Sequence, residues 1–264
     1  MIGIFDSGVG GMTVARAIEQ ALPQYRIVYF GDLAHTPYGS KSPETILKYS
    51  RQNAEFLKSK GAQIIIIACN SAASVASETM RQELDLPVFD VIGPAVNRVR
   101  RLATCHLQKT KIGVIGTRAT VKSGIYHQEI SAICPGAKIY SRECPLLVPL
   151  VEEGWVDKRE TKMILRRYLA PLKNKQIKAL VLGCTHYPLL KELIQPRVGK
   201  NVEIIDSSEE MASELKAYLA EHPDLAERLT NQGDNRYYVS DITEAAALTA
   251  KRIFGREIKL IKDS

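Results

Sequence analysis

Four consecutive isoleucines at residues 64–67 are the feature that most restricts the fold of this chain. A strand with one face in water alternates apolar and polar side chains, whereas a strand covered on both faces is apolar throughout. The run therefore predicts a central strand of a parallel sheet. Other short apolar runs alternate with stretches of helical apolar spacing, so the sequence predicts an α/β protein with right-handed crossovers.

Two helices have ends that can be read from the sequence. Ser42 as N-cap and Pro43 at the first helical position predict a helix from residue 43 to about 60. Near the C-terminus, Asp241 and Glu244 fit a capping box that opens a final helix.

The chain also contains an internal repeat. Its opening "IGIFDSGVGGMTV" resembles the later "IGVIGTRATV", and "IIIIACNSAASV" resembles "ALVLGCTHYPLL". Gly3 and Cys69 are 66 residues apart, and Gly113 and Cys184 are 71 residues apart, so order and spacing agree.

The repeat predicts two pseudo-symmetric α/β domains with mostly parallel sheets that face a central cleft. The residues after the second copy contain a helix near 208–221 and a strand "RYYVS", and we expect them to pack on the first domain. The predicted domains are residues 1–96 with 207–264, and residues 97–206.

Composition narrows the class of protein. Hydrophobic residues make up 45% of the chain and charged residues 25%, as in soluble globular proteins, and no apolar run has membrane-spanning length. No basic and apolar leader follows Met1, so we expect a cytoplasmic protein. Five cysteines without a C-x-x-C pair argue for reduced thiols and against a disulfide framework or a zinc ribbon.

The net charge of +7 is the one compositional hint of a polyanionic partner. Its densest cluster is "RVRR" at residues 98–101, on an expected amphipathic helix at about 96–110. No aromatic interleaving or nucleic-acid motif accompanies it, so we expect no direct nucleic-acid binding. The charge can still help to attract an anionic substrate.

Polar clusters directly follow several of the apolar runs. In a parallel α/β sheet, ligands bind beyond the carboxyl ends of the strands, so these clusters are the candidate site. They are Asp6-Ser7, Asp32, Cys69-Asn70-Ser71 and Cys184-Thr185-His186.

A single cysteine is most often a small buried apolar residue. Cys69 and Cys184 differ because they occupy matching places in the repeat, each at a helix start that favours a thiolate. Cys105, Cys134 and Cys144 lack that setting, and we assign them no role.

Other motifs carry weaker signals. "GVGG" at residues 8–11 is not a dinucleotide fingerprint, and its glycines are read as letting backbone amides approach a small anion. His186 lies two residues after Cys184, but two ligands do not make a metal site, so we expect none. Glu152 and Glu153 precede a glycine turn, and the pattern alone does not decide which one faces the cleft.

Taken together, five segments resemble cofactor-independent glutamate racemase. The segments span residue 2 to about 206 and are "GIFDSGVGGMTV", "YFGDLAHTPYG", "IIIIACNSAASV", "CPLLVPLVEEG" and "LVLGCTHYPLL". Aspartate racemase and other two-cysteine racemases share the paired cysteines, whereas "DSGVGG", "PYG" and "GCTHYP" favour the glutamate branch.

The resemblance implies that Cys69 and Cys184 are the catalytic pair. One removes the α-proton as a thiolate while the other returns a proton to the opposite face, and the roles exchange in the reverse direction. Asp6 or Asp32 is then a candidate to assist Cys69, and His186 to assist Cys184, with Glu152 as a further acid/base group. Substrate contacts are expected from Asp6, Ser7, Pro37, Tyr38, Gly39, Asn70, Ser71, Thr120, Thr185 and His186. Ser71 stands where the family often has threonine.

The resemblance further implies glutamate as substrate, no cofactor, and D-glutamate supplied for peptidoglycan synthesis. We also expect a homodimer. Three alternatives remain open at this point: an aspartate racemase, a protein that binds DNA gyrase, as some glutamate racemases do, and a thiol oxidoreductase.

Overall fold

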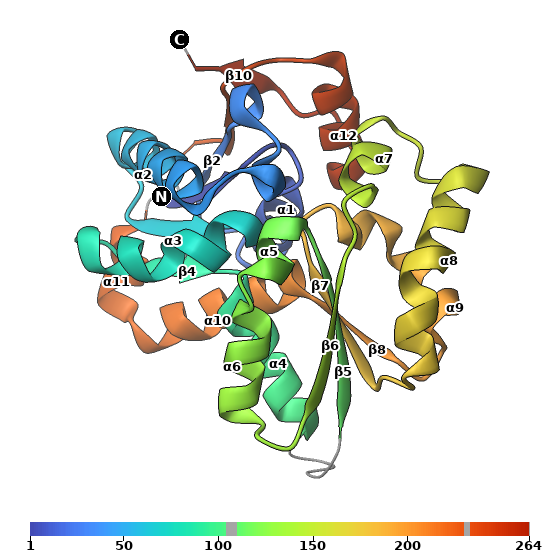
Figure 1. The fold of residues 1–264 in the computed structure, drawn as a ribbon. Helices are drawn as coiled ribbons and strands as arrows, with labels where there is room; N and C mark the ends of the chain where they lie inside the picture. Colours follow the sequence, from blue (N-terminus) through green and yellow to red (C-terminus); the bar gives the residue numbers. More distant parts are fainter. Residues whose placement is uncertain (104–109, 230–232, 264) are drawn as a thin grey trace.

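Two parallel β-sheets organise the protein, whose computed structural model describes residues 1–103, 110–229 and 233–263. One sheet has six strands and the other has four, and helices cover both (Figure 1). Every strand pairing is parallel, which confirms the predicted α/β class with parallel sheets.

The isoleucine run lies inside the six-stranded sheet, where it pairs on both sides and is fully buried. The sheet has the order β10-β9-β2-β1-β3-β4, so two strands from the C-terminal tail extend the edge beside β2. The tail therefore packs on the first half of the chain as predicted, although its last strand was not predicted. The strands are β1 (Ile2–Asp6), β2 (Ile27–Gly31), β3 (Ile64–Ile67), β4 (Val88–Asp90), β9 (Arg236–Val239) and β10 (Leu260–Lys262).

The four-stranded sheet repeats the arrangement of the first. Its order β6-β5-β7-β8 matches β2-β1-β3-β4, with the first strand of each copy in the middle. Gly3 lies opposite Ile65 and Gly113 lies opposite Leu180, so the glycines hold matching places. The strands are β5 (Lys111–Gly116), β6 (Lys138–Glu143), β7 (Ala179–Gly183) and β8 (Glu203–Asp206).

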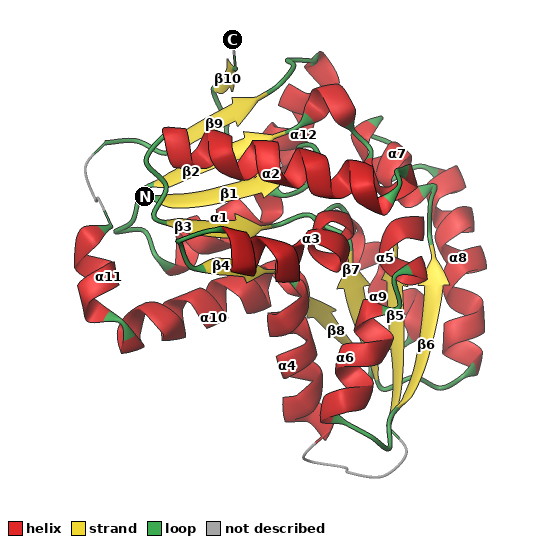
Figure 2. Cartoon of the chain, turned by 60° about the vertical axis from the view of Figure 1, so that its left-hand side comes forward, coloured by secondary structure: helices red, strands yellow, loops and turns green. Residues whose placement is uncertain are grey.

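The helices and short 3₁₀ turns connect these strands. In Figure 2 the carboxyl ends of both sheets point toward one region, near α3 and α5. No helix among the described residues combines the length and the apolar character needed to cross a membrane. The elements are α1 (Met12–Ala21), η1 (Leu33–His35), η2 (Tyr38–Ser40), α2 (Pro43–Ser59), α3 (Asn70–Glu83), α4 (Ile92–Ala103), α5 (Arg118–Lys122), α6 (Ile125–Ile133), α7 (Leu147–Glu152), α8 (Arg159–Asn174), η3 (Tyr187–Leu190), α9 (Lys191–Val198), α10 (Ser207–Glu221), α11 (Pro223–Arg228) and α12 (Glu244–Phe254).

Helix α4 connects the two halves of the molecule and carries the basic cluster. The first half is the part built around the six-stranded sheet, and the second half is the part built around the four-stranded sheet. It begins at Ile92, four residues before the expected start, and Cys105 lies outside the described residues. Arg98 contacts Glu203 at 2.5 Å and Arg101 contacts Glu210 at 2.5 Å, so these cations are paired within the molecule. The pairing leaves less of the cluster available to a polyanion.

The strands of the two sheets come from different parts of the chain. All strands of the six-stranded sheet fall within residues 1–96 or 207–264, and those of the four-stranded sheet within 97–206. The exact domain boundaries stay a prediction, because α4 runs across residue 96.

The two helix ends read from sequence gave different outcomes. Ser42 caps α2 by accepting a hydrogen bond from the backbone N–H of Thr45, as predicted. The capping box at Asp241 is wrong: Thr243 caps α12, and its Oγ1 accepts from the N–H of Ala246 at 3.1 Å. The helix begins only at Glu244, so Asp241 lies outside it. Asp241 instead pairs with Lys262.

The cap assignment predicts a stability difference. Thr243→Ala should lower the free energy of unfolding by about 1 kcal/mol, because an N–H of the first turn loses its acceptor. Urea unfolding followed by circular dichroism measures it. Asp241→Ala is the control, since it removes only an exposed ion pair, and a larger loss in the control would contradict the assignment.

Candidate active site

The ends of β1, β2, β3, β5 and β7 deliver their following residues to one small cavity of about 20 Å³. Both halves of the chain contribute, and both repeat cysteines are present. The lining consists of Ser7, Thr36, Pro37, Tyr38, Gly39, Cys69, Asn70, Ser71, Thr117, Val148, Cys184, Thr185 and His186. Ten of these residues are among those singled out from the sequence.

Cys69 is held as a buried thiol. It follows β3 as the N-cap residue of α3, and its Sγ lies 3.5 Å from Ser7 Oγ. Burial raises the pKa of Cys69 to about 12, and the negative charge of Asp6 adds to the shift. The helix start favours a thiolate, but the loss of water outweighs it. Cys69 therefore carries its proton at neutral pH.

Asp6 lies behind the cavity and does not line it. Its carboxylate accepts from the N–H of Gly8 at 3.0 Å and from Thr185 Oγ1 at 3.4 Å, so it joins the two halves. Burial raises the pKa of Asp6, opposed by the charge of His186 and by these hydrogen bonds. A Cβ on Gly11 would lie 2.4 Å from Asp6 Cβ, which explains a glycine in this turn.

Asp32 is buried and reaches the cavity through Tyr38. Tyr38 donates its hydroxyl proton to Asp32 Oδ2 at 2.5 Å and accepts from Asn53 Nδ2 at 3.0 Å. Asp32 also binds His35 Nδ1 at 2.8 Å and Ser240 Oγ at 3.2 Å. Burial, with help from Asp32, raises the pKa of Tyr38 far above its usual range. Asp32 thus orients Tyr38, whereas its predicted assistance to Cys69 stays a prediction.

The second cysteine has a cationic neighbour. Cys184 Sγ lies 4.0 Å from His186 Nδ1, and His186 Nε2 lies 3.1 Å from Glu152 Oε1. Burial opposes a charge on His186, but the hydrogen bonds and negative charges of Cys184 and Glu152 prevail and raise its pKa to about 10. Of the two adjacent glutamates, Glu152 is the one that contacts His186, whereas Glu153 is exposed.

A chain of hydroxyls crosses between the halves. Ser71 Oγ lies 2.8 Å from Thr117 Oγ1, which lies 3.1 Å from Thr120 Oγ1. Thr120 is buried behind Thr117, and the sequence reasoning named only Thr120. The repeat carried the missing signal, because Thr117 holds the place after β5 that Ser7 holds after β1. Thr36 and Val148 were also missed.

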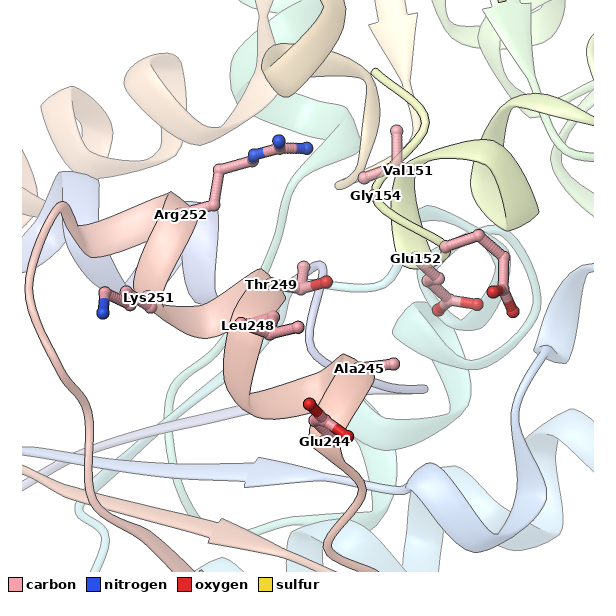
Figure 3. A pocket seen from close by; sticks show the side chains of 10 residues that line it. Val151, Glu152, Gly154, Glu244, Ala245, Leu248, Thr249, Lys251 and Arg252 are labelled. Carbon is pink, nitrogen blue, oxygen red and sulfur yellow. The ribbon is translucent and has the colours of Figure 1, made fainter. Parts of the chain in front are cut away.

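A larger hollow of about 580 Å³ lies beside this site, between α7 and α12 (Figure 3). Its lining mixes glutamates, two cations and Leu248, and it contains no cysteine. Glu152 belongs to this lining and also contacts His186, so it borders both spaces. Among the described residues, no three His, Cys, Asp or Glu side chains gather as a metal ion would require.

Known proteins resemble this chain over nearly its whole length. The family model for Asp/Glu/hydantoin racemase matches residues 10–215. A glutamate racemase of Geobacter metallireducens is 42% identical over 257 residues, covering 97% of this chain and 93% of the relative.

Solved structures agree with this sequence similarity. Glutamate racemase isoform RacE1 of Bacillus anthracis has a TM-score of 0.90 at 34% identity and covers 100% of this chain and 97% of its own. The glutamate racemase of Francisella tularensis in complex with D-glutamate has a TM-score of 0.89 at 36% identity, with coverage of 100% and 97%.

The contact between Glu152 and His186 predicts a shift that NMR can measure. Glu152→Gln should lower the pKa of His186 from about 10, because it removes a negative charge and a charge-assisted hydrogen bond. Glu153→Gln is the matched control and should leave the value unchanged. Equal shifts in both variants would contradict the assignment of Glu152.

The raised pKa of His186 also predicts how the free energy of unfolding changes with pH. The folded pKa of His186, about 10, lies above its ordinary value of 6.5. His186 therefore stabilises the fold fully below pH 6.5, and this contribution is lost as the pH rises through 10.

Proposed function

The chain belongs to the Asp/Glu/hydantoin racemase family, and we propose that it interconverts L-glutamate and D-glutamate with two cysteines and no cofactor. The observation that carries the proposal is the placement of Cys69 and Cys184, one from each repeat, in the lining of one cavity. Racemisation removes the α-proton from one face of the carbon and returns a proton to the other. Two facing copies of one structural unit supply a thiol to each face.

The protonation states of the site suit one direction of this reaction. Cys184, whose Sγ lies 4.0 Å from His186 Nδ1, is assigned as the thiolate base that removes the α-proton of the substrate. Cys69, held as a thiol, then gives its proton to the opposite face of the carbanion-like intermediate. The turnover leaves Cys184 as a thiol and Cys69 as a thiolate, which is the starting state for the reverse direction.

Weak acidity of the α-proton makes electrostatic stabilisation essential, because no electron-withdrawing cofactor shares the charge. Hydroxyls of Ser7 and Ser71 line the cavity and are placed to donate to the carboxylates of glutamate, whereas the Thr185 hydroxyl already donates to Asp6. Asp6 accepts from the hydroxyl of Thr185, which lines the cavity, so its negative charge acts on the α-ammonium group of the substrate through the Thr185 oxygen.

Glutamate is the proposed substrate because the relatives at about 42% identity bear the name glutamate racemase. Aspartate is the alternative, and comparing turnover of the two amino acids separates them. A role in peptidoglycan precursor synthesis, a cytoplasmic location, a homodimer and a DNA gyrase interaction stay predictions from the family resemblance.

The cavity is too small for its proposed substrate in this state. A space of 20 Å³ holds about one water molecule, whereas glutamate needs several times as much. The two halves therefore separate to admit the substrate and close again to exclude water. The contact of η2 with α5 is one place where they meet: a Cβ on Gly39 would lie 2.7 Å from Thr117 Cβ.

The two-cysteine mechanism is tested by isotope exchange. In D₂O, without added cofactor, the protein should place deuterium at the α-carbon of L-glutamate while the optical rotation decays. Cys69→Ala and Cys184→Ala should each slow racemisation by about a thousandfold, since each removes the acid or base of one face. Cys134→Ala is the control and should keep full activity. Wild-type racemisation in either site variant would refute the mechanism.

The closed contact at Gly39 gives an independent test. Gly39→Ala should lower kcat/KM by about tenfold or more, because its methyl group blocks the approach of Thr117. The thermal midpoint should stay near that of the wild type, since the contact joins the halves and fills neither core. Gly93→Ala, where no atom lies within 4 Å of the added Cβ, is the control. An unchanged kcat/KM in Gly39→Ala would argue against closure at this contact.

A further inference from the structure

Tyr126 makes a buried hydrogen bond between the two halves that the mechanism above does not use. It lies on α6 in the second half, and its hydroxyl donates to Asn70 Oδ1 on α3 at 2.7 Å. Only 2% of Tyr126 is exposed, and a Cβ on Gly183 would lie 3.2 Å from its ring. Gly183, the residue before Cys184, therefore leaves room for the Tyr126 ring to pack against the end of β7.

The direction of this hydrogen bond follows from the inventory of donors. Burial, with the charges of Asp90 and Cys184, raises the pKa of Tyr126 far above its usual range, so the hydroxyl keeps its proton. The hydroxyl has one proton to donate, and Asn70 Oδ1 accepts it. If the amide were turned over, its Nδ2 would donate to the Tyr126 oxygen, and the hydroxyl proton of Tyr126 would lose its acceptor.

With Oδ1 turned toward Tyr126, the amide nitrogen of Asn70 faces elsewhere. Asn70 Nδ2 is buried and has no hydrogen-bond partner in the described part of the chain. An unmet buried donor is costly, and native proteins rarely keep one without a reason. Asn70 lines the cavity between the two cysteines, so an oxygen of a bound substrate is the acceptor that the site lacks.

We propose that Tyr126 is a positioning residue, which locks the Asn70 amide so that its N–H₂ group, and not its carbonyl oxygen, is presented to a carboxylate of the substrate. This inference rests on the proposed function, because it concerns the binding of glutamate. Without the Tyr126 hydroxyl the amide is free to turn, and its carbonyl oxygen then repels the carboxylate. Since Tyr126 and Asn70 belong to different halves, the lock forms only when the halves meet, and closure itself completes the binding site.

A double-mutant cycle separates positioning from a general structural role. Racemic glutamate undergoes no net conversion, so calorimetry with it measures affinity alone, and steady-state kinetics gives KM and kcat separately. Tyr126→Phe should weaken affinity and raise KM by about tenfold, with a much smaller change in kcat, because a contact to a charged group is lost in ground and transition states alike. Asn70→Ala should have an effect of similar size.

The decisive variant is Tyr126→Phe combined with Asn70→Ala. If Tyr126 acts through Asn70, the double variant binds glutamate as the Asn70→Ala single variant does. Additive losses would overturn the proposal and leave Tyr126 as a packing residue. Tyr237→Phe is the matched control: it removes another buried hydroxyl, on β9, and should leave KM unchanged.

Measurements on the wild-type protein distinguish a failure of this inference from a failure of the proposed function. Wild-type protein that neither binds nor racemises glutamate would contradict the proposed function, and this inference with it. Wild-type protein that does both, beside a Tyr126→Phe variant with unchanged affinity, would contradict the positioning role alone.

Discussion

Removal of water from a cavity shared by two halves of one chain is the constraint on which the site depends. Burial penalises charge, so it holds Cys69 as a thiol and raises the pKa of Asp6. His186 stays cationic in the same surroundings only because Cys184 and Glu152 lie against it. Desolvation and pairing therefore give the two cysteines, although they follow equivalent strands, different electrostatic surroundings, which suit the acid and base roles of the proposed mechanism.

Close approach of the two halves is what produces this burial, and glycines permit it. A Cβ on Gly10 would lie 2.4 Å from His186, and one on Gly39 would lie 2.7 Å from Thr117. The glycine-rich turn after β1 was read from sequence as a cradle for a small anion. Gly8 does donate its N–H to an anion, but that anion is the carboxylate of Asp6 in the protein itself. Much of the turn serves packing between the halves.

The parts of the site that the sequence predicts are those carried by short-range pattern. Strand ends follow from apolar runs, so Cys69 and Cys184 were placed correctly at the ends of β3 and β7. Contacts between the halves depend on how two units pack, and a local pattern holds no information about that. The choice of Glu152 over Glu153, the link from Asp6 to Thr185 and the bond from Tyr126 to Asn70 are all of this kind. The cap at Thr243 was missed for a local reason, since two overlapping registers both offered an acceptor.

The residues that line the cavity come from both halves of the chain, and under the proposed mechanism this determines the order in which closure and proton transfer occur. In the open state that the proposal requires, water would reach Cys69 and Asp6, and the burial that raises their pKa values would be lost. Closure would then bury the Cys69 thiol and bring Tyr126 to Asn70 at the same time. In the proposed mechanism, proton transfer becomes possible only after the substrate is enclosed, when no solvent competes for the α-carbanion. Under this proposal, the two copies of the repeat provide one cysteine for each face of the α-carbon, and the packing between the copies determines when a proton can be transferred.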